Sequence, residues 1–163
     1  MCRKPNTRLI SAAVIGLLLV VANHGPAFSA PFTLPDGVVV STPATFDELV
    51  GKVEKAVANA GLGVVALASA SRGAASRGVT IPGNAVVMVF RNDIAVRLLK
   101  ANVAAGFEAP LRIYITENAD GTASLSYRKP SVVLAPYTGD EVKAIARELD
   151  VAFEKIGAEV ASR

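Results

Sequence analysis

The stretch that decides the fold is Ala109–Pro130, which reads APLRIYITENADGTASLSYRKP. Apolar residues occupy every second position in its first half, and the alternation returns in its second half, as in strands with one buried face. Between the halves lies Asp120-Gly121, a pair that favours a turn because glycine tolerates a positive φ. The stretch therefore predicts a β-hairpin whose apolar face, which needs cover, consists of Leu111, Ile113, Ile115, Ala123, Leu125 and Tyr127.

Segments with helical spacing of apolar residues lie on both sides of this hairpin and can supply that cover. Further short apolar runs before the hairpin predict additional strands. Antiparallel strands covered by helices on one face make an α+β two-layer sandwich. In chain order we expect a strand at 38–41, a helix at 46–60, a strand at 62–68, a short helix or loop within 70–83, a strand at 85–90, a helix from about 92, the hairpin, and a last helix ending near 157.

Several local patterns give more specific expectations. Thr45–Glu48 and Thr138–Glu141 both have the spacing of a capping box, in which a threonine and a glutamate satisfy the first amides of a helix. Asn92 or Asp93 is expected to cap the helix that starts there, and a cap is the expected role of Asn92. Ala85–Phe90 is apolar throughout, which is typical of a strand covered on both faces, and Ser131–Pro136 is expected to be extended.

The first 29 residues have the features of a secretory signal peptide. Three basic residues precede an apolar run of about 14 residues, and small residues follow at the expected cleavage position. That run is short for a membrane span of about 20 residues. We therefore expect residues 1–29 to be a signal peptide, 30–44 an extended leader that runs into the first strand, and 45–160 a single α+β domain without a membrane span. The mature protein is expected to be exported, to the periplasm or outside the cell.

Cleavage after Ser29 changes the chemistry that the chain can offer. It removes the single cysteine, the single histidine and three basic residues, so 14 basic residues remain against 14 acidic ones. A zinc site built on cysteine or histidine is thereby excluded, as is a Ser-His or Cys-His catalytic pair. We expect no metal and no cofactor. We also expect no nucleic-acid partner, because a chain without net charge lacks the field that dominates such binding.

The sequence resembles the domain-of-unknown-function 302 family over roughly residues 46–153. The resemblance rests on Gly61-Leu62-Gly63-Val64-Val65 after the first helix, on Phe90-Arg91-Asn92-Asp93, on Ala109-Pro110-Leu111-Arg112-Ile113, and on Tyr127 followed by Pro130. It implies a fold like that of the TATA-box-binding protein, a curved antiparallel sheet backed by helices and often dimeric. This fold name carries no implication of DNA binding.

The sequence also departs from the pattern of this family. Arg91 and Asp93 stand where members commonly have glycine and proline, and the histidine that many members carry around positions 70–71 is absent. The cysteines of one branch, near Arg91 and Leu111, are absent too. Thiol, metal or imidazole chemistry of relatives therefore does not transfer to this chain.

The candidate site residues are Asn92, Arg112, Tyr114, Tyr127 and Lys129. Arg112 and Tyr114 share one strand face, where a guanidinium fork and a flat ring suit a small anion or an aromatic acid. Asn92 is an alternative ligand contact through its amide. The competing interpretation is structural, with Arg112 paired to a nearby acid, Tyr127 in the core and Asn92 as a helix cap.

Three functions remain open from the sequence. The first is a non-catalytic module that binds a small ligand or a protein partner. The second is a homodimeric structural module that buries an apolar sheet face against its own copy. The third is an enzyme with acid–base chemistry between Tyr127 and Lys129, which would require a lysine pKa depressed by burial or by a neighbouring cation.

Overall fold

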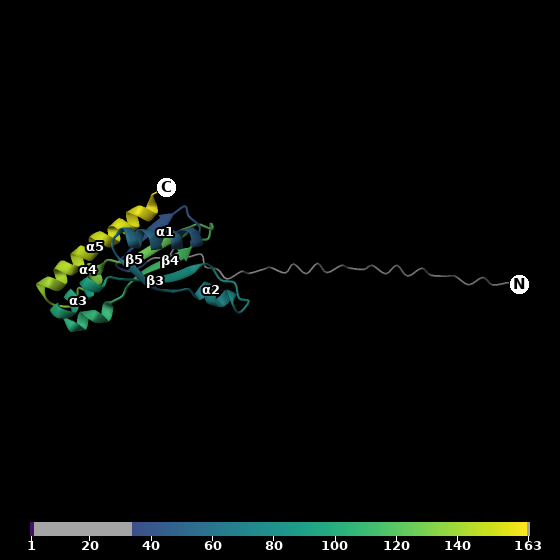
Figure 1. The fold of residues 1–163 in the computed structure, drawn as a ribbon. Helices are drawn as coiled ribbons and strands as arrows, with labels where there is room; N and C mark the ends of the chain where they lie inside the picture. The colour runs from purple at the N-terminus through teal and green to yellow at the C-terminus, as the bar shows by residue number, and fades with distance from the viewer. Residues whose placement is uncertain (2–33, 163) are drawn as a thin grey trace.

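The structure, a computed structural model, describes Met1 and residues 34–162 (Figure 1). The predicted signal peptide lies almost entirely outside the described residues. Within residues 34–162, a two-layer α+β domain is found, with an open antiparallel sheet covered by helices on one side. Both the fold class and the layer arrangement predicted from the sequence are therefore confirmed.

The sheet has five strands in the order β1-β5-β4-β3-β2, and every neighbouring pair is antiparallel. The edge strand β1 pairs with β5, which joins the start of the domain to the second strand of the hairpin. A bulge between Val64 and Ala66 interrupts the opposite edge. The strands are β1 (Gly37–Thr42), β2 (Gly63–Ala68), β3 (Asn84–Phe90), β4 (Leu111–Glu117) and β5 (Ala123–Arg128).

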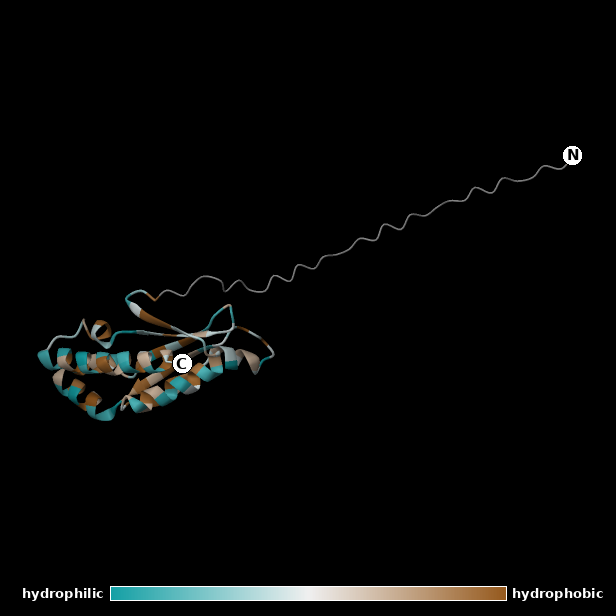
Figure 2. Ribbon diagram, turned by 90° about the horizontal axis from the view of Figure 1, so that it is seen from above, coloured by the Kyte–Doolittle hydropathy of each residue, from teal (hydrophilic) through white to brown (hydrophobic). Residues whose placement is uncertain are grey.

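The helices cover one face of this sheet, which Figure 2 shows from above. Two of them, α1 and α5, pack against each other as well as against the strands. The core consists of the inward side chains of the sheet and the apolar stripes of these helices, including Leu49, Ile113 and Phe153. The helices are α1 (Phe46–Asn59), α2 (Ala70–Ala75), α3 (Asn92–Ala101), the 3₁₀ helix η1 (Val103–Glu108), α4 (Pro130–Val133) and α5 (Asp140–Ala161).

The hairpin forms as the sequence predicts. Ile113 lies opposite Tyr127 and Ile115 opposite Leu125, so the apolar positions of both strands face the helices. Gly121 has a φ of 82°, and its amide donates a hydrogen bond of 3.0 Å to the carbonyl of Asn118. The turn residue predicted from Asp-Gly therefore adopts the left-handed conformation that glycine favours.

The first capping box is also confirmed. The backbone amide of Thr45 donates a hydrogen bond of 2.9 Å to the Glu48 carboxylate, and α1 starts at Phe46. This hydrogen bond lowers the pKa of Glu48. At the other end, Gly61 has a φ of 76°, which ends the helix with a residue that tolerates this geometry.

Two predictions for the region after the hairpin are wrong. Pro130–Val133 forms the short helix α4 at the start of the stretch expected to be extended, because proline suits the first helical position. Helix α5 lacks the second capping box: Gly139, with a φ of 121°, occupies the cap position, and no side chain caps the helix. Glycine adopts this φ readily, so the chain turns at Gly139 and not at Thr138.

The prediction that β3 is covered on both faces is wrong as well. Residues Ala85, Val87 and Val89 are buried under the helices, whereas Val86, Met88 and Phe90 are only half-buried on the opposite side. The strand is apolar on both sides although helices cover only one. The opposite sheet face, which no helix of residues 34–162 covers and which is called the uncovered sheet face below, therefore carries apolar side chains.

Candidate functional site

The uncovered sheet face brings together polar and apolar side chains from four strands. The strand register aligns Val39, Ser126, Tyr114 and Val86 in one row across β1, β5, β4 and β3. Val39 is 41% exposed, whereas Ser126 is buried and its hydroxyl donates a hydrogen bond of 3.3 Å to the Tyr114 carbonyl. Tyr114 thus lies between an apolar neighbour on β3, Val86, and a polar neighbour on β5, Ser126.

A second row on the same face carries two arginines. Met88 lies opposite Arg112, and Gly37 lies opposite Arg128. Since Ile113 pairs with Tyr127, the next positions of the antiparallel register place Arg112 beside Arg128. Both side chains are exposed, and within residues 34–162 neither forms an ion pair.

Two like charges directly opposite each other on neighbouring strands destabilise a sheet. No carboxylate of the described residues lies within ion-pair distance of Arg112 or Arg128. An anion placed between the two guanidinium groups would relieve the repulsion between them, and guanidinium forks match carboxylate, sulfate and phosphate oxygens. This arginine pair (Arg112 and Arg128) with the neighbouring Tyr114 and Met88 is the candidate functional site.

The structure separates the five residues predicted as site residues. Arg112 and Tyr114 share the uncovered face, as expected. Tyr127 lies on the opposite face, is 3% exposed and meets the ring of Phe153 edge-on at 5.2 Å between centroids. Burial, followed by the nearby negative charge of Glu154, raises the pKa of Tyr127. Tyr127 is therefore a core residue that cannot join a ligand site with Arg112.

Lys129 lies beyond the end of β5, at the start of α4. Its ammonium group donates a hydrogen bond of 3.0 Å to the Glu154 carboxylate, and this contact raises the lysine pKa. The proposed acid–base pair of Tyr127 and Lys129 requires the opposite shift. The geometry therefore gives no support to proton transfer between these two residues.

Asn92 is the first residue of α3 and does not cap it. The cap position belongs to Arg91, and no side chain caps this helix. The expectation of an asparagine cap is wrong because Asn92 is already helical, whereas a cap residue lies just before the first helical residue. Asn92 lies away from the arginine pair, at the junction of β3 and α3.

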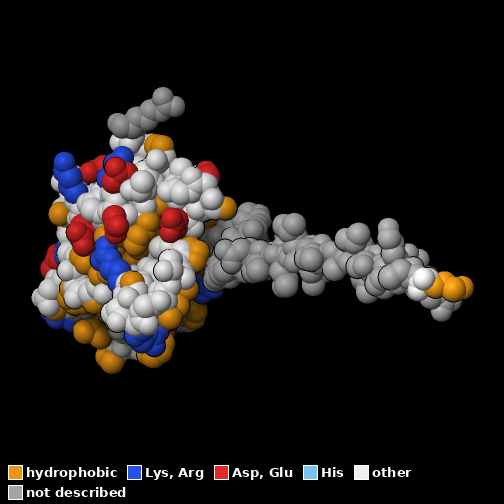
Figure 3. Space-filling model, turned by 90° about the vertical axis from the view of Figure 1, so that its right-hand side faces the viewer, with side chains coloured by type: hydrophobic (Ala, Val, Ile, Leu, Met, Phe, Trp, Pro, Cys, Tyr) orange, Lys and Arg blue, Asp and Glu red, His pale blue; other side chains and the backbone are white. Residues whose placement is uncertain are grey.

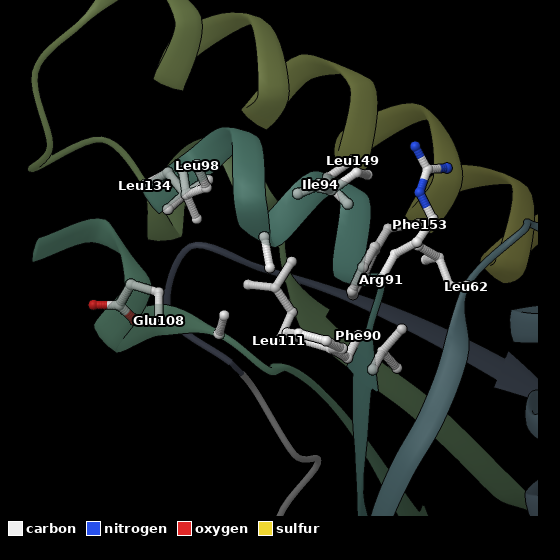
Figure 4. A pocket seen from close by; sticks show the side chains of 13 residues that line it. Leu62, Phe90, Arg91, Ile94, Leu98, Glu108, Leu111, Leu134, Leu149 and Phe153 are labelled. Carbon is white, nitrogen blue, oxygen red and sulfur yellow. The ribbon is translucent and has the colours of Figure 1, made fainter. Parts of the chain in front are cut away.

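A separate apolar pocket lies beside this junction, between the sheet, α3, η1 and α5 (Figure 4). Its volume is about 40 Å³. Two charged residues, Arg91 and Glu108, stand among its lining residues. The rest of the lining is aliphatic or aromatic and includes Leu62, Ile94, Leu98, Leu111, Leu134 and Phe153.

Both charged residues of the pocket have partners. The Arg91 guanidinium donates hydrogen bonds of 2.9 Å to Asp93 and 2.8 Å to Glu148. The Glu108 carboxylate accepts one of 2.8 Å from the hydroxyl of Tyr137. Glu148 also accepts a bond of 2.7 Å from Arg97, which joins α3 to α5.

We expect a Glu148→Gln variant to be less stable than the native protein at neutral pH, by about 1 kcal/mol at most because the network is partly exposed. Hydrogen bonds from Arg97, with the positive charges of Arg97 and Arg91, lower the pKa of Glu148 below its ordinary 4.5. A carboxylate whose pKa is lowered in the folded state stabilises the protein at pH values above its ordinary pKa. This stabilisation is lost as the pH falls through the folded-state pKa. Urea unfolding from pH 7 to pH 3 measures this loss, and a pH-independent difference would contradict the assignment.

Residues 34–162 contain no cluster of three acidic, histidine or cysteine side chains that could hold a metal ion. The helices described here include none with the length and hydrophobicity to cross a membrane. On the face drawn in Figure 3, acidic and basic side chains are interspersed with apolar ones.

These features define a small α+β domain with a half-apolar open sheet face and an arginine pair on it. The chain belongs to the family described as domain of unknown function DUF302, which matches residues 38–160. Its fold is similar to the crystal structure of an uncharacterized conserved protein DUF302 from Bacillus stearothermophilus, with a TM-score of 0.69 and 17% identity over 78% of this chain and 99% of that one. No curated protein matches the chain.

Proposed function

We propose that the protein is an exported, non-catalytic binding module whose uncovered sheet face takes an anionic ligand with an apolar body. The proposal rests on the arginine pair, two exposed arginines that the continued strand register places opposite each other on this face and that have no ion-pair partner among residues 34–162. Tyr114 and Met88 lie beside Arg112 and supply the apolar contact. Export rests on the signal-peptide pattern of residues 1–29.

The ligand chemistry follows from these neighbours. The guanidinium groups favour carboxylate, sulfonate or phosphate oxygens. The half-buried residues Val86 and Met88 lie opposite Tyr114 and Arg112 in the register and offer apolar contact. A flat aromatic acid offers both an oxyanion for the arginines and an apolar ring for the neighbouring side chains. A purely inorganic anion offers only the oxyanion and is expected to bind more weakly.

We expect 2-naphthalenesulfonate to shift the backbone amide NMR signals of β4 and β5 in a saturable manner. Uncharged 2-naphthol should bind much more weakly, because it offers no oxyanion to the arginine pair. An Arg112→Gln variant should lose at least about tenfold in sulfonate affinity, the loss expected when a charge-assisted hydrogen bond is removed.

Arg147→Gln is the matched control, because Arg147 is an exposed arginine on the helix layer. Its sulfonate affinity should equal that of the native protein. Equal affinities of Arg112→Gln and the native protein would remove the arginine pair from the binding site. The absence of any sulfonate binding to the native protein would contradict the anion-binding proposal itself.

A second candidate function is a protein-interaction module, including the homodimer. The observation that favours it is a run of exposed apolar side chains along α3 and η1, among which Phe107 is 88% exposed. Contiguous exposed apolar residues mark interaction surfaces. Light scattering at tens of micromolar, on the native protein and on a Phe107→Ser variant, tests whether the partner is a second copy of the chain. A native dimer that becomes a monomer in the variant supports self-association. A native monomer excludes the homodimer.

A further inference from the structure

The apolar pocket has no role in the proposed anion site. It lies among the ends of β3 and β4, helix α3 and helix α5, whereas the arginine pair lies on the uncovered sheet face. In Figure 4, side chains from these separate segments converge on it, among them Ile94 of α3, Leu111 of β4 and Phe153 of α5. A binding role for this pocket is therefore independent of the arginine pair.

The chemistry of the pocket selects against a charged occupant. Arg91 is already bonded to Asp93 and Glu148, and Glu108 to Tyr137. In Figure 4 the charged ends of both side chains point away from the apolar side chains, so an occupant of the pocket meets a lining that is aliphatic or aromatic. Water is also a poor occupant, because a buried water requires about two to four polar partners.

The size of the pocket further limits the kind of ligand that can enter it. A volume of about 40 Å³ exceeds what one water molecule needs. It is well below the roughly 150 Å³ of a dry cavity that accepts a whole benzene molecule. A narrow, flexible group enters such a space more readily than a rigid ring.

We infer that this pocket is a second binding site, which accepts the uncharged end of an aliphatic chain. Its contacts are dispersion contacts with Ile94, Leu98, Leu111 and Phe153, and they require burial of apolar surface without new hydrogen bonds. The polar part of such a ligand stays at the surface, outside the lining.

The test is a titration of the full domain with 1-octanol and with 1,8-octanediol, followed by the methyl NMR signals of Leu111, Leu134 and Ile94. Octanol should give saturable shifts at these methyl groups. The diol has the same chain but must bury a hydroxyl, so it should bind at least about tenfold more weakly. Equal shifts from both compounds, or none from octanol, would overturn the inference.

An Ala95→Leu variant tests the location, because Ala95 lines the pocket from α3 and leucine suits a helix. The larger side chain should fill the pocket and abolish the octanol shifts, while thermal unfolding shows that the variant remains folded. Ala101→Leu, the same change at an exposed position of α3, is the control and should leave octanol binding unchanged. If Ala95→Leu fails to fold, a competition experiment between xenon and octanol on the native protein replaces it. Octanol shifts that xenon leaves unchanged would contradict binding in this pocket.

Arg112→Gln separates this inference from the proposed anion site. That variant should lose sulfonate binding and keep octanol binding, because Arg112 is not among the pocket residues. Loss of octanol binding in Arg112→Gln would contradict two independent sites.

Discussion

A Phe153→Ala variant is expected to lose about 3–5 kcal/mol of unfolding free energy, which is the usual cost of removing a buried phenylalanine ring. Phe153 is 1% exposed, and its ring contacts Tyr127 in the edge-on geometry that favours aromatic pairs. Domains of this kind are stable by only about 5–15 kcal/mol. The variant should therefore unfold at much lower urea concentration, or fail to fold at 37 °C.

Val151→Ala on the same helix is the matched control. Val151 is 67% exposed, so its truncation should change the unfolding free energy by no more than about 0.5 kcal/mol. Comparable losses in both variants would show that Phe153 does not hold α5 to the sheet.

The second large effect concerns two glycines, because replacing each by alanine is expected to change the unfolding free energy in opposite directions. A Cβ at Gly83 would lie 2.5 Å from the ring of Phe46, too close without movement of the ring or the backbone. Gly83→Ala should therefore lower the unfolding free energy by about 1–3 kcal/mol, the usual cost of overpacking. Gly51, in the middle of α1, has no atom within 4 Å of such a Cβ. Gly51→Ala should raise the unfolding free energy by about 0.5–1 kcal/mol, because alanine favours helices.

Chemical denaturation of both variants under one condition measures this difference in sign. A stabilised Gly83→Ala would mean that the Phe46 ring moves without cost. A destabilised Gly51→Ala would mean that the middle of α1 has a neighbour that the described residues do not provide.

The fold was predictable where a local pattern is strong. Alternation in residues 111–127 and the Asp-Gly turn located the hairpin, and its register then followed from the turn. The first capping box located the start of α1. These signals come from residues close together in the sequence, so they could be recognised without knowledge of the tertiary packing.

The remaining helix starts were less predictable because more than one residue suits each cap. Asn92 and Thr138 are good caps by type, yet the chain uses Arg91 and Gly139. Gly139 adopts a φ of 121°, which glycine tolerates, and this backbone conformation places the start of the helix after Gly139. Pro130 likewise fits an extended strand and a first helical turn equally well by sequence, and the structure has the turn.

The sequence predicted two of the residues of the candidate site, Arg112 and Tyr114. It placed Arg112 with Tyr114 on one strand face but also included Tyr127, which alternation assigns to the opposite face. The same alternation, carried across the hairpin, gives Arg128 as the neighbour of Arg112. The apolar pocket could not be predicted in this way, because its lining comes from segments that meet only in the folded chain.

The pairing of β1 with β5 has a consequence for the order in which the domain can be completed. Thr42, the last residue of β1, donates a hydrogen bond to Ala123, which lies 81 positions later in the chain. During synthesis the first strand therefore has no partner until the hairpin has emerged, and helix α5, which packs against both β1 and α1, follows later still. Contacts of such long sequence separation form late in folding, so we expect the β1 edge of the sheet to be added last, after the hairpin has formed.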